Sequence, residues 1–252
     1  MDNDPPAPPA VLQLRPRRVL IAMLAVLVFL AAMHASLLVV PWLVSAHHPL
    51  WGLPRLFDLA GEGNLAAYWS TACLLFGAAL LALVAVETRR LGRPFVRHWF
   101  VLAAAFLFLS LDEAAQIHEG VIARIWVEHF GRGHGIFYYV WYLPILPVVA
   151  IAFLLYLPFL RHLERRFLLR VVAAGALYLG GAVGGDMVES WIVDAGRSDA
   201  TVATQLVEES LEIGGATLFD YALLSLLASL NASLLVGVGP ERRGGAIPRS
   251  GV

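Results

Sequence analysis

The sequence predicts an all-α fold, a polytopic transmembrane helix bundle of six spans. Hydrophobic residues make up 59% of the 252-residue chain and charged residues 15%, whereas soluble domains carry about 25% charged residues. The apolar residues come in runs long enough to cross roughly 30 Å of hydrocarbon, which takes about 20 residues of helix. The arginines gather in alternate connections between these runs, as they do in multi-pass membrane proteins.

The apolar runs predict spans at 19–43, 64–87, 98–122, 136–160, 167–193 and 203–236. The first run exceeds the core of a signal peptide, which is about 7–15 residues, so we expect it to be retained as a helix. Residues 1–18 are Pro-rich and predict a disordered cytoplasmic N-terminus. Residues 19–236 then form one transmembrane domain, and residues 237–252 a disordered cytoplasmic tail.

Arginine placement predicts the orientation. Fourteen of the 18 arginines lie in one alternate set of connections: Arg15, Arg17, Arg18, Arg89, Arg90, Arg93, Arg97, Arg161, Arg165, Arg166, Arg170, Arg242, Arg243 and Arg249. The positive-inside rule then places both termini in the cytoplasm, an N-in/C-in topology. We therefore expect an integral, multi-pass protein of the plasma (inner) membrane.

The acidic residues are distributed the opposite way. Of the 19 acidic residues, 14 fall on the extracytoplasmic side or within the spans. Each charge at membrane depth costs at least about 2.5–3.5 kcal/mol, so such groups are expected to face one another, water, a metal or a ligand. At a rise of about 1.5 Å per residue, four of them and one histidine lie roughly 5–14 Å below the outer surface: Glu113, Asp186, Glu209, Glu212 and His34. We therefore predict a site that faces the extracytoplasmic side.

Helical phase adds a constraint on the third span. Asp112, Gln116 and Glu119 share one face of a regular helix, at spacings of four and seven residues. Glu113 and His118 lie on opposite sides of Asp112, so a regular helix does not aim both at one point. Either one of them has a different role or the helix is distorted there.

Two further patterns concern helix contacts and the membrane boundary. Gly180, Gly181, Gly184 and Gly185 permit close helix approach on the fifth span, and Gly214 and Gly215 permit it on the sixth. They favour a core of spans three, five and six with the carboxylates facing inward. The aromatic run 137–142 is typical of an interfacial belt, and a substrate gate is the alternative interpretation.

Carboxylates with a few histidines and no thiolates favour a divalent metal ion, Zn, Fe, Mn, Mg or Ca. The candidate ligands are Glu113, His118, Glu189, Glu209 and Glu212. Asp112 or Glu119 would then act as a catalytic base on a metal-bound water. Further site candidates are His34, Asp186, Glu208 and Gln116. The spans contain no Glu-x-x-His sequence, so the resemblance to di-metal carboxylate sites is one of composition and not of motif.

These residues favour a metal-dependent membrane enzyme that acts on a lipid or an extracytoplasmic small molecule. A proton- or cation-coupled transporter is the alternative, because intramembrane carboxylates also serve as proton relays and cation sites. A structural or accessory membrane subunit is the third hypothesis. The net charge of −1 gives no argument for a nucleic-acid partner, and membrane lipid is the expected one. The sequence leaves open whether the protein is an enzyme, and what its substrate and oligomeric state are.

Overall fold

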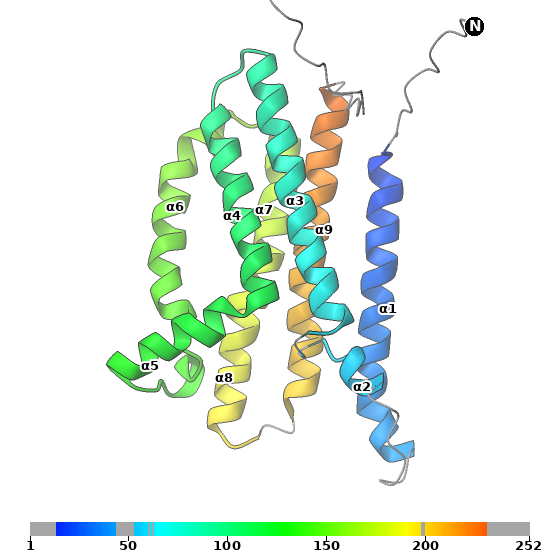
Figure 1. Cartoon of the computed structure of the whole chain (residues 1–252), viewed down its shortest axis with the longest axis vertical. Coiled ribbons are helices and arrows are strands. Elements are labelled where there is room, and N and C mark those ends of the chain that lie inside the picture. The colour runs from blue at the N-terminus through cyan, green and yellow to red at the C-terminus, as the bar shows by residue number, and fades with distance from the viewer. Residues whose placement is uncertain (1–13, 44–52, 60, 62, 198–199, 231–252) are drawn as a thin grey trace, which may run out of the picture.

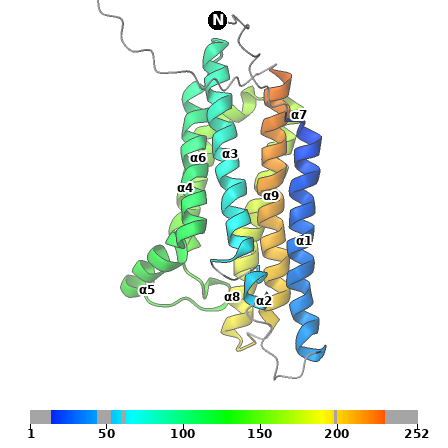
Figure 2. The ribbon, with the colours of Figure 1, turned by 45° about the vertical axis from the view of Figure 1, so that its right-hand side comes forward.

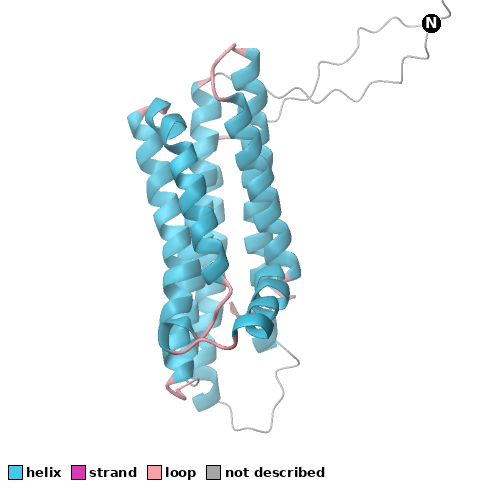
Figure 3. Ribbon diagram, turned by 90° about the vertical axis from the view of Figure 1, so that its left-hand side faces the viewer, coloured by secondary structure: helices cyan, strands magenta, loops and turns pink. Residues whose placement is uncertain are grey.

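The computed structural model describes residues 14–43, 53–59, 61, 63–197 and 200–230, which are all helix, turn and loop (Figure 3). Six helices in this part of the chain are long and apolar enough to cross a membrane. They are α1 (Pro16–Leu43), α3 (Leu65–Arg90), α4 (Val96–Ala115), α6 (Tyr142–His162), the run from α7 (Arg165–Leu179) to α8 (Asp186–Asp194), and α9 (Thr201–Ser229). The predicted all-α fold with six spans is confirmed, and it supports a multi-pass membrane protein.

Helix α9 is the centre of the tightly packed half of the bundle. It packs against α1, α3 and α7 (Figures 1 and 2). Where α3 and α9 meet, Leu81, Val84, Ala222 and Leu223 are completely buried and form part of one apolar cluster. Because this burial removes apolar area from solvent and fills space tightly, it fixes α3 and α9 relative to each other.

The two ends of the bundle differ in charge. The α3–α4 and α6–α7 connections lie at the same end (Figure 1), and they carry arginines that include Arg89, Arg93, Arg161 and Arg165. We call this the arginine end. The opposite end carries the short helices α2 (Leu53–Leu56) and α5 (Arg124–Phe130) and the end of α8. Which end faces the cytoplasm stays a prediction.

The third span is shorter than the sequence indicated. It was expected to reach residue 122, but α4 ends at Ala115 because Gln116 adopts a left-handed conformation with φ 54°. Such a conformation is uncommon for a residue other than glycine, and it ends a right-handed helix. The chain continues as a π-helical turn, η1 (His118–Ala123), and then as α5, which leaves the bundle to one side (Figure 1).

Helix α6 is attached to the bundle mainly at its two ends. It begins at Tyr142, six residues after the predicted start of the fourth span, because residues 135–141 form a short 3₁₀ turn, η2 (Gly135–Phe137), and an irregular connection. Only Tyr142 and Phe159 are buried among the residues of α6. The middle of the helix therefore does not pack tightly against α4 or α7, and this spacing leaves room for a cavity.

Glycines determine how closely the fifth span approaches α9. A second π-helical segment, η3 (Gly180–Gly185), joins α7 to α8. A Cβ atom at Gly181 would lie 2.7 Å from the backbone oxygen of Glu208, and one at Gly185 would lie 2.6 Å from the Glu208 side chain. A Cβ at Gly215 would lie 2.6 Å from the backbone nitrogen of Tyr178. The predicted close approach is confirmed at these three glycines, whereas Gly180 and Gly184 face open space.

Candidate functional site

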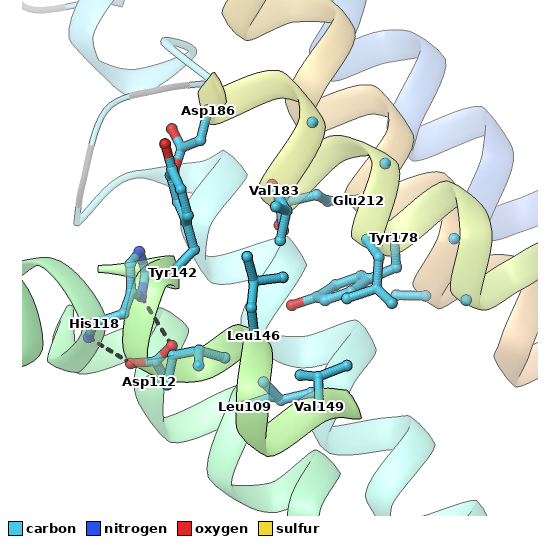
Figure 4. A pocket seen from close by; sticks show the side chains of 18 of the residues that line it. Leu109, Asp112, His118, Tyr142, Leu146, Val149, Tyr178, Val183, Asp186 and Glu212 are labelled. Carbon is cyan, nitrogen blue, oxygen red and sulfur yellow. Dashed lines mark hydrogen bonds and ion pairs between the residues drawn. The ribbon is translucent and has the colours of Figure 1, made fainter. Parts of the chain in front are cut away.

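A cavity of about 1200 Å³ lies between α4, α6, the α7–α8 run and α9 (Figure 4). Pockets for small molecules usually measure about 300–1,000 Å³, so this one is large. Its lining extends from Phe167 to Glu189 along the fifth span, which is roughly 33 Å of helix. The cavity therefore has a length comparable with the hydrocarbon thickness of a bilayer, roughly 30 Å.

One end of the cavity is acidic. Its lining includes eight carboxylates but only one arginine, Arg132, and one histidine, His118. The carboxylates are Asp112, Glu113, Glu119, Asp186, Glu189, Glu208, Glu209 and Glu212. The structure thus brings together every acidic residue that the sequence singled out for the site, from α4, η1, α8 and α9. We call this region the acidic end.

The other end of the cavity is apolar. Trp99 and Phe106 of α4, Phe153 and Phe159 of α6, and Phe167 of α7 line it on three sides. These residues lie toward the arginine end of the bundle, because α6 and α7 connect there. We call this region the apolar end. A cavity with one acidic and one apolar end has the polarity pattern of an amphiphile.

Asp112 holds His118 with two hydrogen bonds. The His118 backbone N–H donates to Asp112 Oδ1 at 2.8 Å, and His118 Nδ1 lies 2.8 Å from Oδ2 (Figure 4). The break at Gln116 makes this possible, because it turns the chain so that residue 118 returns to the carboxylate six residues earlier. The His118 ring also packs on Trp141, with centroids 4.7 Å apart. With Nδ1 bound to a carboxylate, Nε2 is the nitrogen available for chemistry.

The surroundings raise the pKa of His118 above its ordinary 6.5. Burial alone would lower the pKa of the imidazole, because it disfavours the charged form. The hydrogen bond and the charge of Asp112 oppose this, and the charges of Glu119 and Asp186 add to them. The net result is an imidazole that takes up a proton more readily than one in water, and whose protonated form is stabilised by Asp112.

Glu189 is the centre of a second hydrogen-bond network. Its Oε1 accepts from the Tyr139 hydroxyl at 2.9 Å and from Gln205 Nε2 at 3.1 Å. The backbone N–H of Tyr139 donates to Ser190 Oγ at 3.0 Å. Burial, and then the charge of Glu189, raise the pKa of Tyr139, so this phenol remains a proton donor. The network fastens the connection before α6 to α8.

Asp186 and Glu208 form a third polar group in the cavity. Trp141 Nε1 donates to Asp186 Oδ2 at 2.5 Å. The Oε2 atom of Glu208 is buried and has no hydrogen-bond partner.

His34 and Gln116 lie elsewhere. His34 Nδ1 accepts from the Leu59 backbone N–H at 2.9 Å, and its Nε2 lies 3.1 Å from the Val202 carbonyl oxygen. It is completely buried and joins α1 to α9 and to the segment before α3. Neither His34 nor Gln116 lines the cavity. Gln116 instead provides the left-handed residue that ends α4.

The described residues contain no group of three or more His, Cys, Asp or Glu side chains arranged to hold a metal ion. Asp112, Asp186 and Glu189 each accept hydrogen bonds from protein donors. A divalent metal bound by Glu113, His118, Glu189, Glu209 and Glu212 stays a prediction.

Several residues that line the cavity were not among the predicted site residues. Tyr139 and Trp141 belong to the aromatic run that was interpreted as an interfacial belt, yet both line the cavity and bond to its carboxylates. Tyr178 and Gln205 also line it, and Figure 4 shows the Tyr178 hydroxyl directed into the cavity. The signal in the sequence was that Tyr and Trp side chains carry hydrogen-bond donors. A chain with many acidic residues in its spans offers carboxylates that can accept from these donors.

One family matches most of this chain. The family described as a domain of unknown function (DUF8692) matches residues 19–227, which cover nearly all of the six spans, and the chain belongs to that family. Neither a curated protein nor a solved structure matches the chain.

Proposed function

For this member of the DUF8692 family, we propose an intramembrane enzyme that acts on an amphiphile and uses His118 as its general base. The substrate's head group binds at the acidic end of the cavity and its hydrocarbon chain at the apolar end. The observation that carries the proposal is the pair of hydrogen bonds by which Asp112 holds His118 at the acidic end.

The Asp112–His118 pair has the geometry of a positioned base. A carboxylate bonded to Nδ1 fixes the ring and its tautomer, and stabilises the imidazolium that forms when Nε2 accepts a proton. In the proposed step, Nε2 takes a proton from water or a substrate hydroxyl while the oxygen of that group forms a bond to an electrophilic centre of the substrate. The bond between this centre and the leaving group then breaks, and Nε2 returns the proton to the leaving group. Asp112, which the sequence suggested as a base, is a positioning residue in this proposal.

The apolar end supports a hydrocarbon chain as the rest of the ligand. Its lining is aromatic and aliphatic, including Trp99, Phe153 and Phe159. The middle of α6 is not buried against neighbouring helices, so a lipid-soluble molecule has a short path from the membrane into the cavity. Burial of apolar area contributes about 0.8 kcal/mol per CH₂ group, which gives a long chain most of its affinity.

The charges at the acidic end limit the head group. Eight carboxylates share this end with one arginine. A phosphate or carboxylate head would meet like charge in surroundings of low dielectric constant, where repulsion is strong. A neutral or cationic head group fits this balance.

The experiment is an untargeted turnover assay. The purified protein is incubated with the lipid extract of its own membrane, and mass spectrometry follows which species disappear and which appear. We expect wild type to convert a neutral or cationic amphiphile, and His118→Gln to be inactive while retaining its thermal stability. Equal conversion by wild type and His118→Gln would refute the proposed role of His118.

The same geometry also suits a metal ligand, because metal-bound histidines commonly donate their second nitrogen to a carboxylate. Nε2 would then be a ligand of the predicted divalent metal. Elemental analysis of the purified protein separates the two uses. Stoichiometric metal that His118→Gln loses would assign Nε2 to metal binding, and turnover by metal-free protein would assign it to proton transfer.

A further inference from the structure

A second polar site lies away from the cavity, in the packed half of the bundle. Asp220 on α9 is 1% exposed, and neither of its carboxyl oxygens has a hydrogen-bond partner. The Thr217 hydroxyl, one turn earlier on α9, is also fully buried without a partner. Neither residue lines the cavity.

The surroundings of Asp220 provide no compensating charge. No arginine or histidine among the described residues lies within ion-pairing distance of it. Arg170 packs over the neighbouring Tyr221 ring, 5.3 Å from its centroid, and makes no ion pair with Asp220. The one titratable side chain recorded beside Asp220 is the buried thiol of Cys73 on α3. An ionised carboxylate with neither donor nor counter-ion is strongly disfavoured in an apolar interior.

The packing around the carboxyl group excludes a large ion. A Cβ atom at Gly77 of α3 would lie 2.8 Å from Asp220 Oδ1 and 3.0 Å from the Phe106 ring. The carboxyl group therefore sits directly against the bare backbone of α3. Calcium and magnesium ions need a shell of about six to eight oxygen ligands, whereas the unpartnered buried side-chain oxygens here are those of Asp220 and Thr217. A proton needs no such shell.

We propose that Asp220 is an intramembrane proton-binding site, held between α3 and α9 and occupied by a proton at neutral pH. Phe106 and Phe219 stack with centroids 4.6 Å apart, and both line the apolar end of the cavity. Because Phe106 also lies beside Gly77, this pair stands between Asp220 and the cavity. Release of the proton requires water to reach Asp220, and therefore a movement of Phe106 or a separation of α3 from α9.

Infrared spectroscopy of the full-length protein tests this proposal at neutral pH. We expect the spectrum of wild type minus Asp220→Asn to show the C=O band of a protonated carboxyl group, shifted in D₂O. The matched control is Asp194→Asn, a more exposed acid whose carboxylate accepts from the Gly135 backbone. Its difference spectrum should show carboxylate bands instead. Carboxylate bands for Asp220→Asn would overturn the proposal.

A stability measurement gives an independent answer. Asparagine has the shape of a neutral aspartic acid, so Asp220→Asn should fold and melt like wild type at acidic pH, where the carboxyl group is protonated in the folded and the unfolded chain alike. As the pH rises above about 4, the ordinary pKa of an aspartic acid, the unfolded wild type loses this proton while the folded protein keeps it. We therefore expect the melting temperature of wild type to fall progressively below that of Asp220→Asn between about pH 4 and neutral pH. A variant that fails to fold, or a difference that does not depend on pH, contradicts a proton held at Asp220.

Discussion

The two halves of this bundle are built differently, although both are made of apolar helices. Eleven residues of α3 and eleven of α9 are buried, and they include glycine, alanine, serine and threonine, which let the backbones approach. Only two residues of α6 are buried, whereas α4 has three and packs against α3 along its other side. The helices of both halves have similar hydropathy. The difference in burial therefore comes from the size of the side chains and from the distance between the helices. Close packing makes one half a scaffold, and loose packing gives the other a cavity.

Loss of the imidazole should have the largest effect, and only on the cavity half. His118→Gln removes the proposed base, and a general base contributes about 10²–10⁴-fold to a rate. We expect turnover of the amphiphile to fall by that factor while the melting temperature stays unchanged. His134→Gln is the control, because this histidine is 88% exposed in a loop. A loss of stability in His118→Gln that matches its loss of activity would point to a structural role.

Two adjacent glycines of η3 test the contrast between close and loose packing, because Gly181 faces α9 and Gly180 faces open space. Gly181→Ala places a Cβ 2.7 Å from both the Glu208 backbone and the Glu212 side chain, whereas Gly180→Ala places one in open space. Overpacking of this kind costs about 1–3 kcal/mol, so Gly181→Ala should lower the free energy of unfolding by that amount. Gly180→Ala should leave it unchanged or raise it slightly. Equal effects in a denaturation experiment would contradict the assigned helix faces.

The pH dependence of turnover should report the Asp112–His118 pair. A base acts when it is unprotonated, and the pKa of His118 is raised above 6.5. Turnover should therefore fall on the acidic side, with a midpoint above pH 6.5. Asp112→Asn removes the charge that raises this pKa, so the midpoint should move to lower pH while the rate drops. A midpoint that moves upward or stays fixed in a kcat/KM profile would exclude Asp112 as the positioning residue.

Removal of metal should have the smallest effect under the proposed chemistry. If His118 acts as a base, chelation should leave both turnover and melting temperature unchanged. If instead the divalent metal predicted from the carboxylates is present, chelation should abolish turnover. It should also lower the melting temperature of wild type more than that of Glu209→Gln, which lacks a predicted ligand.

The sequence predicted the spans and the gathering of acids because both follow from one-dimensional patterns. Runs of apolar residues determine which helices can cross a membrane. The helical rise counted from the outer boundary of each span placed Glu113, Asp186 and Glu212 at similar depths. The break at Gln116 was not predictable in detail. The left-handed conformation of Gln116 depends on tertiary contacts and not on the local sequence. Here the hydrogen bond from the His118 backbone N–H to Asp112 supports it. From the helical phase we could conclude only that Glu113 and His118 do not point in the same direction on a regular helix.

The cavity itself was beyond the reach of the sequence. Its existence depends on the distance between α6 and its neighbours, and α6 is apolar on every side, so no face of it marks a contact or a void. The bonding partners of the aromatic residues before α6 were not predictable for a related reason. Composition places Tyr139 and Trp141 near a membrane boundary, but only the fold shows that they bond to Glu189 and Asp186.

Two neighbouring valines of α6 test the central claim, that the cavity holds the substrate's hydrocarbon chain. Val149 lines the cavity, whereas Val148 does not and is 61% exposed on the outside of the helix. Turnover and binding of the amphiphile are measured for Val149→Trp and Val148→Trp. We expect Val149→Trp to fill the cavity and raise KM sharply, most for the longest chains, while Val148→Trp behaves as wild type. Equal behaviour of the two variants would contradict the account.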